Sequence, residues 1–197
     1  MKILKKFLFL FLIIILPTEY IYAKDPTLFI SEITENASAI LKKNISIDEK
    51  ANNLIKIAEE NVDIDGIGLY SLGKYRKSID INQLDQYKIV FREYFLKTFS
   101  SRLSQYSDPK IIVVSQNVIN EKYTIVSSIL VETDERPEIK IDWRVYTINH
   151  DNPLIRDLII EGLSLARTQK EEFSSVIQSA DGDINALFAN LENFNSN

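Results

Sequence analysis

The sequence predicts an α+β fold in which helices pack on one face of a four-stranded antiparallel sheet and enclose an apolar cavity. Before residue 108 and after residue 163, apolar residues recur every three or four positions, which is the spacing of amphipathic helices. Between residues 110 and 160, β-branched residues recur with a period of two, which is typical of strands. Helices and strands are therefore segregated along the chain, and this order favours an α+β domain.

The first 23 residues have the pattern of an export signal. Three lysines precede an unbroken run of Phe, Leu and Ile over residues 7–16, and Ala23 offers a small residue at the end of a plausible cleavage site. The apolar run is too short for a membrane anchor, because a helix needs about 20 apolar residues to cross a membrane. We therefore expect a cleaved signal peptide over residues 1–23 and a single domain over residues 24–197.

Two helices are expected at the start of the domain. Asp25 followed by Pro26 has the form of an N-cap with proline at the first helical position, and the apolar spacing continues to about Lys43. Ser46 and Glu49 have the spacing of a capping box, in which each side chain accepts a backbone hydrogen bond at the helix start. The second helix therefore begins at this box.

A short helix is expected over residues 64–73, and the longest helix of the chain follows it. Asp80 and Gln83 have the layout of a second capping box, and apolar residues then recur at helical spacing. Asp108 followed by Pro109 is expected to end this helix.

The four strands are expected over residues 111–118, 122–132, 138–147 and 154–160. Short turns join them, and short connections between consecutive strands imply an antiparallel meander. Gly162 ends the last strand, and a helix is expected over residues 163–179. Gly182 then suits a left-handed cap position, and Asp183 caps a last helix.

The composition excludes several kinds of chemistry. The chain has no cysteine, which rules out disulfides, thiolate metal sites and lipid attachment at a cysteine. Its net charge of -5 argues against a nucleic-acid partner, which needs a concentrated basic face. The single histidine, His150, lies in a polar turn where we expect a surface residue. Two aspartate-rich segments, 63–66 and 181–183, lack the glutamate that completes a calcium loop and are better explained as helix caps. We expect no catalytic residue, no metal site and no cofactor.

Aromatic residues are numerous, with nine Tyr and ten Phe, several of them along the long helix after residue 84. Two interpretations are open at this point. The rings can form an ordinary core against the sheet. Alternatively, they can enclose, together with apolar residues of the sheet, a cavity that the protein itself does not fill.

Five short motifs occur in order between Leu72 and Phe173. They are Leu72-Gly73-Lys74-Tyr75, Phe91 to Phe95 with Tyr106, Asp142-Trp143-Arg144, Asp157 to Leu165, and Glu172-Phe173. Each motif is weak alone, but in this order and spacing they resemble the MlaC, or toluene-tolerance, family.

The resemblance implies a periplasmic carrier and no enzyme. Proteins of this family hold a phospholipid by its acyl chains and exchange it between an outer-membrane lipoprotein complex and the inner-membrane Mla ABC transporter complex, a role in outer-membrane lipid asymmetry. The resemblance therefore implies a phospholipid ligand, these two membrane complexes as partners and a periplasmic location. Hopanoid-related lipids are a second cargo that the family leaves open. We also expect a monomer.

The expected lipid pocket combines aromatic residues of the long helix with apolar residues of the sheet. Two acyl chains contain about 30 methylene groups, and exposing them to water would cost on the order of 20 kcal/mol. A carrier must therefore cover nearly all of this surface. The candidate lining residues are Tyr70, Phe91, Phe95, Phe99, Ile125, Ile129, Ile141, Trp143, Leu163 and Phe173.

A compact basic cluster is formed by Lys74, Arg76 and Lys77. Two readings of this cluster are open. It can be a solvated helix end, where lysine is favourable, or it can contact the lipid phosphate or an acidic docking surface of a partner.

Two alternatives to a carrier are open from the residues alone. A small periplasmic enzyme on a cone-shaped α+β scaffold would need a carboxylate or a histidine inside its cavity, and the sequence offers only Asp142 and Glu161. The other alternative is a chaperone that binds apolar segments.

Overall fold

The computed structural model describes residues 24–134 and 136–196, so the expected signal peptide lies outside the described residues. The helices are α1 (Pro26–Lys42), α2 (Ile47–Asn61), α3 (Ile64–Ser71), the short 3-10 helix η1 (Gly73–Lys77), α4 (Ile81–Leu103), α5 (Leu165–Ser179) and α6 (Asn185–Ser196). The strands are β1 (Ile111–Asn120), β2 (Tyr123–Leu130), β3 (Ile139–Tyr146), β4 (Leu154–Ile160) and β5 (Leu163–Ser164). Among the described residues, no helix is both long and apolar enough to span a membrane.

Side-chain caps fix the helix starts at the positions expected from the sequence. The Asp25 carboxylate accepts hydrogen bonds from the N–H groups of Thr27 (2.9 Å) and Leu28 (3.1 Å) at the start of α1. At α4 the capping box is complete: the Asp80 carboxylate accepts from the Gln83 N–H (2.9 Å), and the Gln83 side chain accepts from the Asp80 N–H (3.1 Å). These contacts confirm the predicted starts of both helices.

The end of α4 differs from the prediction, since the helix stops at Leu103 and not at the Asp108-Pro109 pair. The Tyr106 N–H donates to the Leu103 carbonyl in a turn (3.1 Å), and Asp108 has a φ of 119°. The segment between Leu103 and β1 is therefore a connection, and Tyr106 lies outside the helix.

The sheet is an antiparallel meander, as predicted, with the strand order β1-β2-β3-β4-β5. Within the described residues the sheet has five strands and not the predicted four. Sequence periodicity did not indicate β5, because this strand is only two residues long. Glu161 (φ 48°) and Gly162 (φ 82°) form the two-residue turn that folds β5 back on β4. Positive φ at both positions is the requirement of a tight hairpin turn. The helix expected from residue 163 consequently begins at residue 165.

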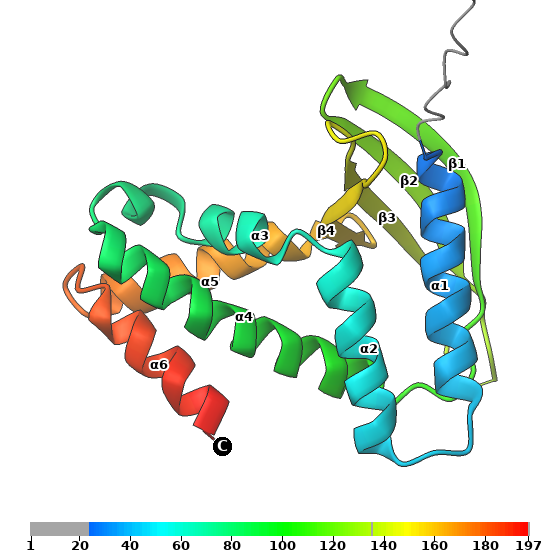
Figure 1. Cartoon of the computed structure of the whole chain (residues 1–197), viewed down its shortest axis with the longest axis horizontal. Coiled ribbons are helices and arrows are strands. Elements are labelled where there is room, and N and C mark those ends of the chain that lie inside the picture. The colour runs from blue at the N-terminus through cyan, green and yellow to red at the C-terminus, as the bar shows by residue number, and fades with distance from the viewer. Residues whose placement is uncertain (1–23, 135, 197) are drawn as a thin grey trace, which may run out of the picture.

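Helix α1 lies along one face of the sheet, which we call the inner face (Figure 1). Phe29, Ile30 and Ile33 of α1 are buried with apolar side chains of the three neighbouring strands. On β2 the alternate residues Val126 and Leu130 belong to this cluster, because successive side chains of a strand point to opposite faces.

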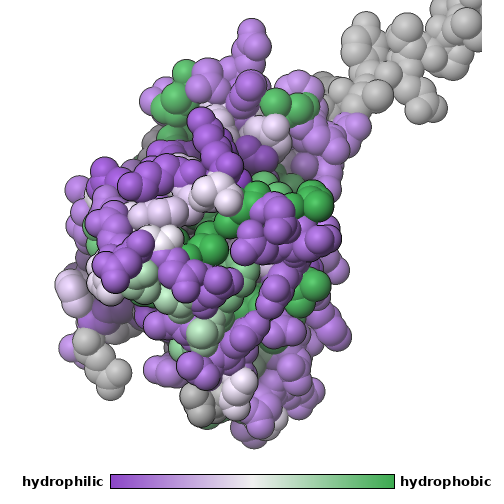
Figure 2. Space-filling view, turned by 90° about the vertical axis from the view of Figure 1, so that its left-hand side faces the viewer, coloured by the Kyte–Doolittle hydropathy of each residue, from purple (hydrophilic) through white to green (hydrophobic). Residues whose placement is uncertain are grey.

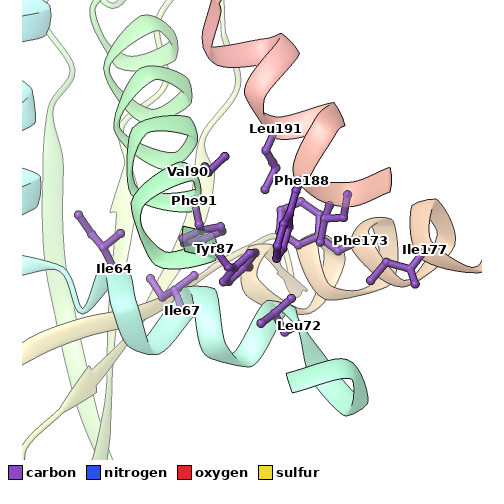
Figure 3. Close-up of a cluster of buried hydrophobic side chains, with 11 residues drawn as sticks. Ile64, Ile67, Leu72, Tyr87, Val90, Phe91, Phe173, Ile177, Phe188 and Leu191 are labelled. Atoms are coloured by element: carbon purple, nitrogen blue, oxygen red, sulfur yellow. The ribbon is translucent and has the colours of Figure 1, made fainter. Parts of the chain in front are cut away.

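The elements α3, η1, α4, α5 and α6 form a second body of packed helices, which we call the helical wing (Figure 1). Its core contains Tyr87 and Phe91 of α4, which stack with a centroid distance of 5.6 Å, together with Phe173 and Phe188 from α5 and α6 (Figure 3). Gly68 of α3 allows the close approach of α4, because a Cβ atom at this position would lie 2.7 Å from the Phe91 ring. The chain thus builds two separate apolar clusters.

Candidate functional site

An apolar pocket of about 240 Å³ lies between α1, α2, the last turns of α4 and the inner face of the sheet. Helix α1 contributes five residues to it and α2 four, while β3 and β4 contribute three each. The lining residues are Ile33, Thr34, Ala37, Ser38, Leu41, Leu54, Ile57, Ala58, Asn61, Val62, Phe99, Leu103, Tyr106, Pro109, Ile111, Leu130, Ile139, Ile141, Trp143, Ile155, Leu158 and Ile160.

Three polar side chains in the lining donate their hydrogen bonds to the protein backbone. The Thr34 hydroxyl donates to the Ile30 carbonyl (2.9 Å), and the Asn61 amide donates to the Ile57 carbonyl (2.8 Å). The Ser38 hydroxyl donates to the Pro109 carbonyl and so ties α1 to the connection before β1. The pocket wall therefore presents mainly hydrocarbon to a ligand.

Trp143 is the single tryptophan of the chain and is held by a chain of hydrogen bonds on the inner face. Its indole N–H donates to the Ser128 hydroxyl (2.8 Å), which donates in turn to the Ile141 carbonyl (3.1 Å). The buried indole nitrogen is therefore satisfied, and the ring is held at the pocket in a fixed orientation.

Three of the ten sequence-predicted pocket residues, Phe99, Ile141 and Trp143, lie together in the lining. Phe91 and Phe173 lie in the core of the helical wing, where their rings meet edge to face at 6.1 Å. Phe95 packs on the same core and stacks on Phe99 at 6.0 Å. The aromatic stripe of α4 is therefore shared, with its first part in the wing and its last turns at the pocket.

The other four predicted residues lie away from the lining. Ile125 and Ile129 point to the outer face of the sheet, because they alternate with the buried inner residues of β2. Tyr70 is exposed on α3, below the Lys170 ammonium at 5.3 Å. Leu163 is 52% exposed at the sheet edge, on the same side of the sheet as its partner Ile160.

The residues that sequence reasoning missed come mainly from α1 and α2. Ile33, Ala37 and Leu41 of α1, with Leu54 and Ala58 of α2, carry a visible helical apolar spacing. That signal shows that these faces are covered by something apolar. It does not show whether the cover is protein or ligand.

Among the residues that the structure describes, no carboxylate or histidine lines the pocket. Asp142 alternates with the inner residues Ile141 and Trp143, and it accepts a hydrogen bond from the Ser127 hydroxyl (2.6 Å) on the other face. Glu161 is exposed in the β4–β5 turn and accepts from the Lys140 N–H (2.5 Å). Within residues 24–134 and 136–196, no group of three or more potential metal ligands occurs.

The basic cluster Lys74, Arg76 and Lys77 is exposed on η1, at the end of the wing farthest from the sheet (Figure 1). Helix α4 begins beside it and reaches the pocket at Phe99, and at 1.5 Å per residue the path from Ile81 to Phe99 is about 27 Å. The face that this end of the wing turns outward is largely hydrophilic, with some apolar residues gathered near its centre (Figure 2). The cluster therefore lies far from the pocket.

A second hollow, a groove of about 510 Å³, lies between α2, α4 and α6 and has charged walls. Asp48, Glu93 and Lys97 line it, and the Lys97 ammonium donates to the carbonyls of Phe194 and Asn195 (3.0 Å each). Lys97 therefore holds the end of α6 beside this groove, whose lining also includes the apolar residues Ala51, Ile55 and Leu96.

Comparison with known proteins identifies a matching protein family and a solved structure with a similar fold. The family model described as MlaC protein matches residues 31–193. No curated protein sequence matches. Among solved structures, the phospholipid-binding protein from Ralstonia solanacearum, determined in complex with a phospholipid, is similar in fold, with a TM-score of 0.73 and 17% sequence identity. The match covers 87% of this chain and 97% of that one.

Proposed function

The chain belongs to the MlaC protein family, and we propose that it is a soluble phospholipid carrier that holds acyl chains in the pocket between α1, α2, α4 and the sheet. The observation that carries this proposal is the apolar pocket, in which the Thr34, Ser38 and Asn61 side chains donate to the backbone. The phospholipid complex of the Ralstonia solanacearum protein, which shares the fold, supports it.

The energetics of such a carrier follow from the pocket's composition. Burying about 30 methylene groups at roughly 0.8 kcal/mol each offsets the cost of removing a lipid from a bilayer. The bilayer is equally apolar, so the transfer into the pocket is close to balanced. Direction must then come from the membrane complexes that deliver and accept the lipid.

The pocket is too small to hold a two-chain lipid without rearrangement. A volume of about 240 Å³ is below the roughly 300–1,000 Å³ of ordinary small-molecule sites. A two-chain lipid is larger than such small molecules. The elements that line the pocket must therefore move apart when a lipid enters.

The single tryptophan provides the test. Trp143 lines the pocket, so a phospholipid with brominated acyl chains should quench its fluorescence on binding, whereas the unbrominated lipid should not. Absence of quenching, together with no lipid recovered by extraction of the protein after incubation with vesicles, would overturn the proposal.

A matched control moves the fluorophore into the wing. The double variant Trp143→Phe, Phe173→Trp keeps one tryptophan but places it in the wing core, where Phe173 is buried against α4. The same brominated lipid should leave its fluorescence nearly unchanged, although lipid extraction should still find lipid bound. Equal quenching in both proteins would place the acyl chains elsewhere.

The cellular location and the membrane partners of the carrier are also proposals. The signal-like pattern of residues 1–23 supports export to the periplasm, and the family supports exchange between an outer-membrane lipoprotein complex and the inner-membrane Mla ABC transporter complex. The basic cluster on η1 is too far from the pocket for a headgroup whose tails lie there, so its proposed role is docking to an acidic surface of a partner.

A further inference from the structure

The pocket meets solvent at Tyr106. This residue belongs to the lining, yet 37% of its surface is exposed. It lies in the connection between α4 and β1, next to the lining residue Pro109. We call this end of the pocket the mouth.

Arg136 stands at the mouth. The centre of its guanidinium lies 5.5 Å from the centroid of the Tyr106 ring. A tight turn holds its backbone, because Thr133 and Arg136 exchange two hydrogen bonds, from the Thr133 N–H (2.8 Å) and from the Arg136 N–H (3.1 Å). The position of the guanidinium is therefore fixed by both its ring contact and its turn.

Within residues 24–134 and 136–196, the hydrogen-bonding capacity of Arg136 is largely unused. A guanidinium has five N–H donors, and to these residues Arg136 makes one side-chain hydrogen bond, from Nη2 to the Val131 carbonyl (3.3 Å). Among the described residues, its buried Nε has no hydrogen-bond partner and its guanidinium has no ion-pair partner. Lys42, by contrast, is paired with Asp108 at 2.9 Å. The enclosed Nε is out of reach of a ligand, so the acceptor of a ligand would bind the Nη atoms, which carry four of the five donors.

We propose that Arg136 binds the phosphate group of the lipid whose acyl chains fill the pocket. This inference rests on the proposed function. The planar guanidinium matches the geometry of phosphate oxygens, and a lipid with its tails in the pocket would place its phosphate at the mouth. Every glycerophospholipid carries this phosphate, so the contact distinguishes phospholipids from neutral diacyl lipids and is indifferent to the rest of the headgroup.

The surroundings of Arg136 favour a lipid phosphate over a free one. Glu132, Asp134 and Glu138 flank it in the same hairpin, and all three are exposed. This local negative charge does not attract a free anion. A lipid phosphate reaches the site because the burial of its tails holds it there.

The experiment is a competition that does not depend on the amount of folded protein. The native protein and its Arg136→Gln variant are incubated with vesicles that contain equal amounts of a phospholipid and of a diacylglycerol with the same acyl chains. The ratio of the two lipids bound to the repurified protein is measured by mass spectrometry. Loss of the charged contact should lower the ratio of phospholipid to diacylglycerol about tenfold or more, and Arg136→Lys should restore part of it.

The matched control is Arg102→Gln, which removes one exposed positive charge from the last turn of α4 and should leave the ratio unchanged. An unchanged ratio in Arg136→Gln would overturn the inference and leave the carrier function intact. A native protein that binds neither lipid would overturn both. Calorimetric titration of the lipid-free protein with inorganic phosphate should show no binding, and tight binding that Arg136→Gln abolishes would instead assign the site to a free anion.

Discussion

Ala37 illustrates how a single small side chain keeps the pocket open. It lies on the side of α1 that lines the pocket, whereas Ala39, two residues later, is exposed on the same helix. The two alanines therefore share a helix and differ in what they face. No property of the residue type itself distinguishes them.

We expect the variant Ala37→Trp to lose most of its lipid binding, because the indole would occupy the space of an acyl chain. The variant Ala39→Trp should bind lipid as the native protein does. Binding is measured by mass spectrometry of lipid extracted after incubation with phospholipid vesicles, and thermal unfolding verifies that both variants fold. Equal lipid content in the two folded variants would contradict this assignment of the pocket.

Tyr87 makes the stability of the helical wing sensitive to alkaline pH. Burial raises the pKa of its phenol far above the ordinary value of 10, and its hydroxyl donates to the Gly68 carbonyl at 3.0 Å. The folded state therefore keeps the proton more tightly than the unfolded chain does. This contribution to stability is complete below about pH 10, and it is lost as the pH rises toward the folded pKa, at up to about 1.4 kcal/mol per pH unit.

The variant Tyr87→Phe should lose about 1 kcal/mol of stability at neutral pH, because the Gly68 carbonyl loses its donor. Above pH 10 its free energy of unfolding should fall less steeply than that of the native protein. Urea unfolding across this range measures both effects. The variant Tyr106→Phe, at an exposed tyrosine, should follow the native curve, and parallel slopes for Tyr87→Phe and the native protein would refute the prediction.

At the scale of elements, Asp157 joins the sheet to the wing. Its carboxylate is buried on β4 and accepts hydrogen bonds from the Ser164 hydroxyl (2.6 Å) and the Ala166 N–H (3.0 Å), with Arg144 at 3.6 Å. Ser164 is also the N-cap of α5. These contacts give a physical reason for the presence of Asp157 and Ser164 in one motif. The Asp157 carboxylate orients the first turn of α5, and Ser164 caps it.

The variant Asp157→Asn should lose about 1.5–3 kcal/mol in free energy of unfolding, because a buried charge-assisted acceptor becomes a neutral amide. Asp142→Asn, on the outer face, provides the control and should lose less, since its one side-chain hydrogen bond is to Ser127 on a half-buried surface. Chemical denaturation with the same probe measures both. A smaller loss for Asp157→Asn than for Asp142→Asn would show that the contacts of Asp157 with Ser164 and Ala166 are not important for stability.

Sequence patterns located the elements well because their signals are local. The Asp80–Gln83 box marks a helix start by contacts within four residues, and strand alternation shows which residues of β2 share a face. Alternation could not show which face is inner, so Ile125 and Ile129 were assigned to the pocket although Val126 and Leu130 point inward. Strand β5 was missed because two residues carry no period.

On the scale of the whole molecule, the pocket and the basic cluster are separated by the length of α4. Phe99 lies at the pocket, and Lys74, Arg76 and Lys77 lie beyond the other end of the helix. This separation predicts that lipid binding and partner docking can be disturbed independently.

Reversing the charges of Lys74, Arg76 and Lys77 to Glu should leave the lipid content of the purified protein unchanged and slow lipid transfer to the membrane complexes. Transfer is followed with a fluorescent phospholipid and reconstituted complexes. Reversal of Lys56, Lys122 and Lys140, which are exposed elsewhere, changes the net charge equally and should slow transfer less. Equal rates for the native protein and the η1 variant would exclude a docking role and leave the cluster as a solvated helix end.

The sequence alone determined the fold class, the antiparallel meander, the starts of α1, α2 and α4 and the family, because these depend on periodicity, capping and motif order along the chain. Only the tertiary structure decided which apolar faces meet each other and which face an unfilled space. Helix α4 shows the reason: its apolar stripe is uniform in sequence, but its first turns pack against α3, α5 and α6, while its last turns border the pocket. Burial of apolar surface is non-directional, so the pattern of a stripe cannot specify whether protein or lipid will cover it.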